Sequence, residues 1–179
     1  IGGYGGYGIG VLDDNEVYNP ALDSWDIKAS MPAARGFSAT ATLNGKIYVI
    51  GGYNSNNNVV STVEVYDPAN NSWTTGPSIS IARMSACAVT LNGKIYLMGG
   101  FPNPNGVNAL NSVEIFDPAT NTWSLGKSFY YPRGFVFSKV ENNRIYLIGG
   151  SNGNDLSYVE EFDPLKNTWN IKTEMPLKN

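Results

Sequence analysis

The stretch GKIYVIGG, residues 45–52, ends in a pair of glycines and returns twice with small changes. It reads GKIYLMGG at 93–100 and NRIYLIGG at 143–150, and the chain opens on the matching end, IGG. Each Gly pair is followed by a Glu-x-aromatic-(Asp/Asn)-Pro element and then by a Trp. The element begins at Glu16, Glu64, Glu114 and Glu160, and the tryptophans are Trp25, Trp73, Trp123 and Trp169. Successive tryptophans are 48, 50 and 46 residues apart, so the chain consists of repeats of about 50 residues.

The variation in repeat length falls in one segment. The distance from the Glu to the Trp is always 9 residues, and from the Trp to the next second Gly it is always 27. The distance from the second Gly to the next Glu varies through 13, 12, 14 and 10 residues. Because exposed loops tolerate insertions and packed strands do not, this segment is predicted to be a surface loop.

Each complete repeat contains four short segments rich in aromatic and β-branched residues, which is typical of strands. In the second repeat we expect strands near 37–43, 46–51, 62–67 and 72–75. Asn-Gly pairs at 44–45 and 92–93 separate the first two segments, as in two-residue hairpin turns. Four-stranded antiparallel sheets repeated at this period predict an all-β fold, the blades of a β-propeller.

These residues resemble the kelch-repeat β-propeller family, in which a Gly pair closes the second strand and an aromatic-Asp-Pro turn follows the third. The family also has a Met-Pro about six residues after the Trp. Met31-Pro32 and Met175-Pro176 match it, whereas the middle repeats have Ile79-Ser80 and Phe129-Tyr130. The resemblance covers nearly the whole chain and implies about 3.75 blades of a larger, six-bladed ring. We expect a partial blade at 1–28, blades at 33–76, 81–126 and 131–172, and the start of another at 173–179.

Composition excludes several classes of function. The chain has no His and one Cys, so we expect no metal site, no cofactor and no histidine-based catalysis. A net charge of −3 without a basic block argues against nucleic acid as a partner. No apolar run approaches the roughly 20 residues that span a bilayer, so no membrane contact is expected.

The candidate binding site lies where topology brings the variable loops and the connections between blades to one rim. The variable loops are 53–61, 101–111 and 151–157, and each connection carries an Arg ten residues after its Trp. The predicted ligand-binding residues are Arg35, Arg83 and Arg133 with Tyr53, Phe101 and Tyr130. Arginine binds carboxylates through two donors in a fixed fork, and in kelch adaptors arginines near this connection bind acidic peptides. The alternative is structural: each Arg pairs with the Glu of its repeat or caps backbone carbonyls.

No catalytic residues are predicted. The repeated glutamates, one per blade, are too far apart to act as an acid–base pair, which works within about 5–10 Å. Trp73 and Trp123 are expected to be largely buried between strands or blades. Two functions therefore remain. The first is a non-catalytic scaffold that binds a protein or peptide, with an acidic partner and a place in a larger adaptor. The second, implied by resemblance to sialic-acid mutarotases, is a carbohydrate-active or carbohydrate-binding kelch protein.

Overall fold

The computed structural model describes residues 1–6 and 8–176, and within them it is built of strands and turns. Three four-stranded antiparallel sheets follow one another along the chain, which confirms the all-β prediction. No helix in the described part is long and apolar enough to cross a membrane. The first of these sheets contains β6 (Ala39–Leu43), β7 (Lys46–Ile50), β9 (Val63–Asp67) and β10 (Ser72–Gly76). The second contains β11 (Cys87–Leu91), β12 (Lys94–Met98), β13 (Val113–Asp117) and β14 (Thr122–Leu125). The third contains β15 (Phe137–Glu141), β16 (Arg144–Ile148), β17 (Val159–Asp163) and β18 (Thr168–Lys172).

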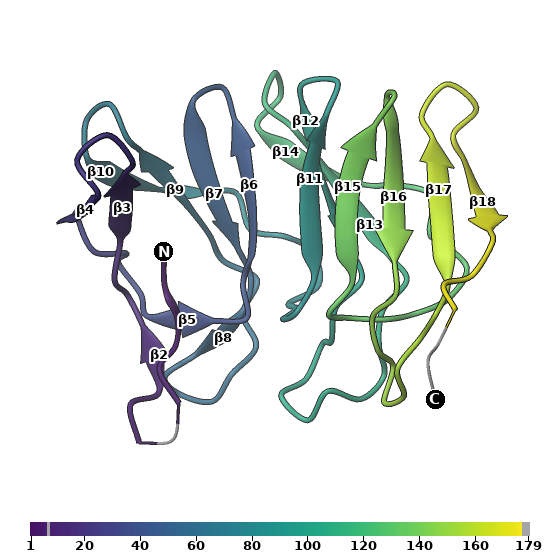
Figure 1. Cartoon of the computed structure of the whole chain (residues 1–179), viewed down its shortest axis with the longest axis horizontal. Coiled ribbons are helices and arrows are strands. Elements are labelled where there is room, and N and C mark those ends of the chain that lie inside the picture. Colours follow the sequence, from purple (N-terminus) through teal and green to yellow (C-terminus); the bar gives the residue numbers. More distant parts are fainter. Residues whose placement is uncertain (7, 177–179) are drawn as a thin grey trace.

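These three sheets are the second, third and fourth blades of a propeller, and they stand side by side (Figure 1). The first repeat contributes the two-stranded sheet of β3 (Glu16–Asn19) and β4 (Ser24–Ile27). The hairpin turns lie at the top of the view, and the variable loops lie at the bottom with the connections between blades. The prediction that loops and connections share one rim is therefore confirmed.

Short ladders at this rim hold the residues that follow the Gly pairs, and no pattern in the sequence predicts them. β5 (Arg35–Gly36) pairs with β8 (Tyr53–Asn54), and β1 (Gly3–Tyr4) pairs with β2 (Val11–Leu12). Single bridges join Met84 to Phe101 and Gly134 to Ser151 at the equivalent places. The residue after each Gly pair is thus fixed by backbone hydrogen bonds.

The tight turns explain why the chain is rich in Asn. A left-handed backbone conformation is less costly for Asn than for most other residues, because its short side chain bonds locally. Asn44 has φ of 50° and precedes Gly45 at 75°, the pattern of a two-residue hairpin turn. The turns before the outer strands likewise have positive φ at Asp23, Asn71, Asn121 and Asn167.

The hydrophobic core lies between blades. One cluster joins Tyr48 and Val65 of the second blade to Ile95 and Phe116 of the third, and a second cluster repeats the arrangement one blade on. The Tyr48 and Phe116 ring centroids are 5.4 Å apart. Each sheet therefore buries both faces only when it has neighbours on both sides.

The tryptophans tie each outer strand to the connection that enters its blade. The indole N–H of Trp73 donates to the carbonyl of Ala29 at 2.7 Å, and Trp123 and Trp169 repeat the bond to Pro77 and Lys127. Trp73 and Trp123 are partly exposed, and Trp123 packs against the core cluster, in agreement with the prediction that both are largely buried between strands or blades. They lie on outermost strands, where one edge of the ring faces solvent.

The Gly pairs mark the closest approach of neighbouring blades. The amide of Gly52 donates to the carbonyl of Arg83 in the next connection at 2.8 Å. Gly51 has φ of 62°, and a Cβ there would lie 2.4 Å from the same carbonyl oxygen. The next junction repeats this geometry between Gly99, Gly100 and Arg133. A side chain at the first Gly would push the blades apart.

The fourth blade departs from the repeat on the face of its sheet that turns away from the third blade, which we call its outer face. Cross-strand pairing places Glu161 beside Tyr146, where the preceding blades pair Val65 with Tyr48 and Ile115 with Tyr96. The same face carries charged or larger polar residues at three further positions that are small or apolar in the second and third blades. Lys139 stands in place of Ala41 and Val89. Glu141 stands in place of Leu43 and Leu91, and Lys172 in place of Gly76 and Gly126.

The charges on this face are paired with one another. The hydroxyl of Tyr146 donates to Glu161 at 2.7 Å, and the ammonium of Lys172 lies 3.1 Å from the same carboxylate. Arg144 lies 2.7 Å from Asp163. Burial works to raise the pKa of Glu161, but the Tyr146 hydroxyl, Lys172 and Arg144 together hold the pKa below its ordinary value.

Replacing Gly51 with Ala tests whether the Gly pair is required for blade packing. Gly45 is the matched control, because its φ of 75° is equally left-handed but a Cβ added there would have no atom within 4 Å. We expect Gly45→Ala to cost about 1 kcal/mol from backbone strain alone, and Gly51→Ala about 3 kcal/mol or more from strain and the clash together. Urea denaturation measures both, and equal costs would contradict a steric role for Gly51.

Candidate functional site

The three repeated arginines are buried in ion pairs with the glutamates of their own blades. Arg83 Nη2 donates to Glu114 Oε1 at 2.7 Å, and Arg133 Nη1 donates to Glu160 Oε1 at 2.9 Å. Arg35 lies 3.2 Å from Glu64. The arginine side chains are at most 3% exposed. Each pair fastens the incoming connection to the third strand of the blade that it begins.

Further hydrogen bonds complete this anchor. Arg83 Nη1 donates to the carbonyls of Gly99 and Ser112 at 3.1 and 3.3 Å, and Glu114 accepts the backbone N–H of Ser80 at 2.7 Å. Arg133 differs, because its guanidinium lies over the Phe129 ring with the Cζ 5.2 Å from the centroid. Its Nε and Nη2 have no hydrogen-bond partner within the described residues.

Burial has the largest effect on the pKa of Arg35, Glu64 and Arg83. Desolvation lowers the pKa of Arg83, and Glu114 opposes the change. It likewise lowers the pKa of Arg35 and raises the pKa of Glu64, and each partner offsets part of the effect. Such pairs add little net stability but are costly to break, since removal of one partner leaves a buried charge. The geometry therefore favours the structural alternative, and direct ligand contact by the three arginines stays a prediction.

The other predicted site residues do not form one group. Tyr130 is 57% exposed, but its hydroxyl donates to the Trp169 carbonyl on the outer strand. Phe101 is buried, and Tyr53 is half-buried, with its hydroxyl donating to Asn57. Tyr53 also lines two open hollows of the rim.

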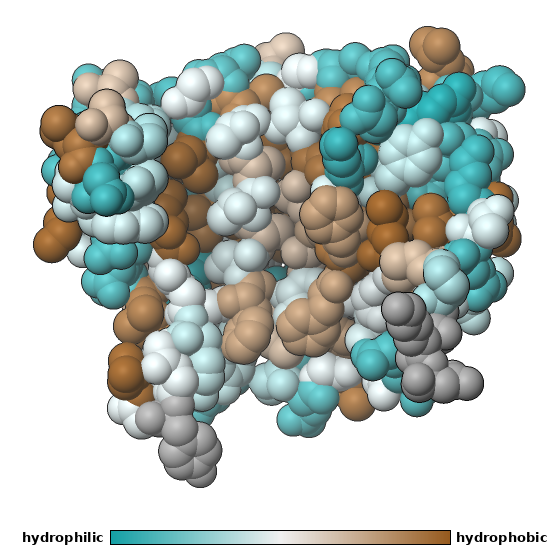
Figure 2. Space-filling view, in the orientation of Figure 1, coloured by the Kyte–Doolittle hydropathy of each residue, from teal (hydrophilic) through white to brown (hydrophobic). Residues whose placement is uncertain are grey.

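An aromatic patch lies on the inner side of the rim, and of its four residues the sequence reasoning had singled out Phe101 and missed the other three. We call Tyr4, Phe37, Phe135 and Phe101 the inner aromatic patch. The Tyr4 and Phe37 centroids are 5.7 Å apart, as are those of Phe101 and Phe135, and Phe37 meets Phe135 edge to face at 6.5 Å. Tyr4, Phe37 and Phe135 are 51%, 42% and 59% exposed. Figure 2 shows hydrophobic side chains gathered in the lower middle of this face.

The backbone under the patch is strained. Phe37 and Phe135 have φ of 56° and 51°, and Ser85, at the same repeat position, has φ of 53°. Residues other than Gly rarely adopt this conformation, and for a bulky side chain it is a marked outlier. Backbone bonds from Ser85 N to the Phe37 carbonyl and from Phe135 N to the Ser85 carbonyl hold the three in place. The available signal was an aromatic residue two positions after Arg35 and Arg133.

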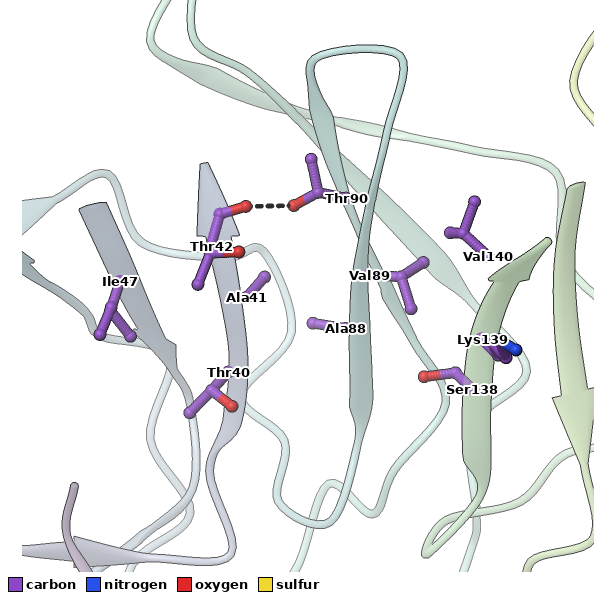
Figure 3. A pocket seen from close by; sticks show the side chains of 10 residues that line it. All are labelled: Thr40, Ala41, Thr42, Ile47, Ala88, Val89, Thr90, Ser138, Lys139 and Val140. Atoms are coloured by element: carbon purple, nitrogen blue, oxygen red, sulfur yellow. Dashed lines mark hydrogen bonds between the residues drawn. The ribbon is translucent and has the colours of Figure 1, made fainter. Parts of the chain in front are cut away.

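The centre of the face is a shallow groove between the innermost strands. It has a volume of about 470 Å³, and its walls are mostly small side chains of β6, β11 and β15 (Figure 3). The hydroxyl of Thr90 donates to the Thr42 carbonyl at 2.6 Å across two blades. Among the described residues, Lys139 is its one charged lining residue. Small side chains allow the inner strands to converge, and the groove offers few groups for chemistry.

The described residues provide no cluster of acidic, Cys or His side chains that could hold a metal ion. Glu64, Glu114 and Glu160 each bind the arginine of their own blade. These three carboxylates are therefore engaged in the frame of the blades.

The chain matches the family model described as the KLHDC2/KLHL20/DRC7 Kelch-repeats domain over residues 1–177. The solved structure of a protein named YjhT resembles it with a TM-score of 0.75, at 23% sequence identity and over 84% of this chain. The match covers 56% of YjhT, so this chain spans a little over half the length of that protein. At this identity the likeness shows the fold alone. No curated protein matches significantly.

Replacing Arg83 with Met tests the structural role of the arginine. We expect a loss of about 3–5 kcal/mol in the free energy of unfolding, because Glu114 is left buried without its counter-charge. Adding Glu114→Gln removes that charge but keeps an acceptor for the Ser80 N–H, so the double variant should regain at least about 1 kcal/mol. Chemical denaturation of both variants gives the comparison. A single-variant cost below about 1 kcal/mol would mean that the guanidinium is free for other contacts.

Proposed function

Because this chain belongs to the KLHDC2/KLHL20/DRC7 Kelch-repeats domain family, we propose that it is a non-catalytic scaffold that binds a protein or peptide. The binding face is the rim that carries the variable loops and the inner aromatic patch. In this proposal the propeller segment is the recognition part of a larger adaptor protein.

The observation that carries the proposal is the exposure of Phe37 and Phe135 on strained backbone. Strain of this kind costs about 1–3 kcal/mol per residue and concentrates at functional sites. The fold would relieve it with Gly at either position, since Gly adopts positive φ freely. Exposed aromatic side chains in a contiguous group are also the residues that binding hot spots favour.

The scaffold is suited to binding because the patch is held rigidly. Phe37 and Phe135 are fixed by backbone bonds through Ser85, and Phe101 by its bridge to Met84. A pre-organised aromatic surface loses little conformational entropy when a partner docks. The loops around it differ in length from blade to blade, so they can contribute different contacts.

A carbohydrate ligand is the second candidate. Tyr53, Asn54 and Asn57 line one hollow of the rim together with Tyr4. Aromatic faces combined with amide groups offer both stacking and hydrogen bonds to a sugar. The proposed experiment therefore includes sugars as a separate arm.

Selection of peptides from a random displayed library, with this chain as bait, tests the function. The decisive variant is Phe37→Gly with Phe135→Gly, which removes both rings and relieves the strained φ. We expect selected peptides to bind it at least about tenfold more weakly, the effect of losing one hot spot. Its stability should stay within about 1 kcal/mol of the parent chain.

Leu165→Ala is the control, because Leu165 is 89% exposed in the turn between β17 and β18, on the opposite rim. Calorimetry should show unchanged peptide affinity for this variant. Selected peptides that bind the double Gly variant as tightly as the parent chain would overturn the proposed face. Binding of neutral sugars with no peptide selected would favour the carbohydrate function instead.

A further inference from the structure

Two hollows lie at the rim, one between the first and second blades and one that also reaches Met84 and Pro104 beside the third blade. The first has a volume of about 310 Å³ and is lined by Tyr4, Ile9, Gly10, Val11, Tyr53, Asn54, Ser55 and Asn57. The second has a volume of about 290 Å³ and is lined by Tyr4, Phe37, Tyr53, Met84 and Pro104. Because Tyr4 and Tyr53 belong to both, we treat them together as the Tyr4–Tyr53 cleft. Each hollow is at the lower limit of small-ligand pockets, about 300 Å³, so it suits one side chain.

Every residue that lines the cleft in the described part of the chain is uncharged. Arg35 and Arg83 lie close in sequence to the lining residues Phe37 and Met84, and both are turned inward, toward Glu64 and Glu114. An acidic group placed in the cleft would therefore lose its hydration without gaining a counter-charge, which is strongly unfavourable.

The charges on the surrounding rim also disfavour an acidic group in the cleft. Its loops and connections carry Asp13, Asp14, Asp155 and Glu174 as exposed carboxylates. Lys28 and Lys127 are the lysines there within the described residues, and they lie one and two residues past the ends of the outer strands β4 and β14. These exposed carboxylates disfavour an anion in the cleft, and Asp13 and Asp14 do so most directly, because they follow Val11, which lines it.

The walls favour an apolar ring over a sugar. The second hollow offers two tyrosine hydroxyls, and that of Tyr53 already donates to Asn57 at 2.6 Å. The rest of its lining is Phe37, Met84 and Pro104. A pyranose has hydroxyls around its ring, and several would be left without partners here. An aromatic side chain would instead pack against rings and a thioether, which are its favourable neighbours.

We propose that the Tyr4–Tyr53 cleft is a subsite for one uncharged aromatic side chain of the bound protein or peptide. The inference rests on the proposed function and deepens it by naming the chemistry of the anchor. Asn54 and Asn57 line the first hollow, and their side-chain NH2 groups can donate to neutral backbone carbonyls of the ligand, since their Oδ1 atoms already accept bonds from Asn56, Asn58 and Tyr53.

Two small molecules that differ in one charge test the proposal. N-acetyl-phenylalanine amide is the neutral probe. N-acetyl-phenylalanine, a carboxylate at neutral pH, is the matched charged probe. In a two-dimensional NMR titration, the amide should shift the signals of cleft residues with millimolar affinity. The carboxylate should bind at least about fivefold more weakly at low ionic strength, and added salt should narrow the difference because it screens the repulsion.

A pair of substitutions at Ser55 sharpens the charge argument. Ser55 is exposed and lines the cleft, so replacement should leave the fold intact. Ser55→Lys should reverse the preference toward the carboxylate, whereas Ser55→Gln, of similar size and uncharged, should keep the preference for the amide. Methyl α-glucoside is included as the sugar probe and should cause no shifts at the cleft.

The outcomes of these titrations separate this proposal from the proposed function. Equal or tighter binding of the carboxylate by the parent chain would overturn the neutral subsite. The neutral subsite would also be overturned if N-acetyl-phenylalanine amide shifted no signals of cleft residues while library-selected peptides still bound the rim. In that case the scaffold function would stand. Shifts from the glucoside alone, with no peptide selected, would overturn both.

Discussion

The arrangement of the blades depends on one residue at each junction, the arginine of the connection. Its backbone carbonyl accepts a hydrogen bond from the second Gly of the preceding blade, as Arg83 does from Gly52. Its side chain meanwhile bonds a Glu on the third strand of the following blade. One residue thus fixes two sheets relative to each other. The Gly pair, the Arg, the Glu and the Trp recur in register because all four meet at the same junction.

The sequence indicated the scaffold well because scaffold contacts repeat. The fixed spacings from Glu to Trp and from Trp to Gly predicted the four-stranded blades, and the strands of the second blade lie within two residues of the expected limits. Repetition also explains the difficulty with the site. Residues that recur in every blade, such as Arg35 and Arg83, are recognised readily, but the structure shows them buried in the frame.

The exposed aromatic surface follows a different rule. Two positions of the repeat lie at the inner rim, and their residues vary between blades. The position after the Gly pair holds Tyr4, Tyr53, Phe101 and Ser151. The position two residues after the repeated Arg holds Phe37, Ser85 and Phe135. Whether such a residue is exposed depends on its neighbours across the junction. Phe101 is covered and Phe135 is not, although their rings are in contact. Spacing along the chain carries no information about that difference.

The face of the fourth blade that turns away from the third blade constrains any surface that packs against it. The junctions between the second, third and fourth blades are apolar, because each core cluster joins one sheet to the next. On the fourth blade, Glu161, Lys172 and Arg144 occupy the equivalent face and pair with one another. An apolar surface laid on this face would strip these charges of water, which is costly. A surface that packs there therefore has to supply polar groups, and inward-pointing charges likewise deter apolar contacts at the edges of other β-sheet proteins.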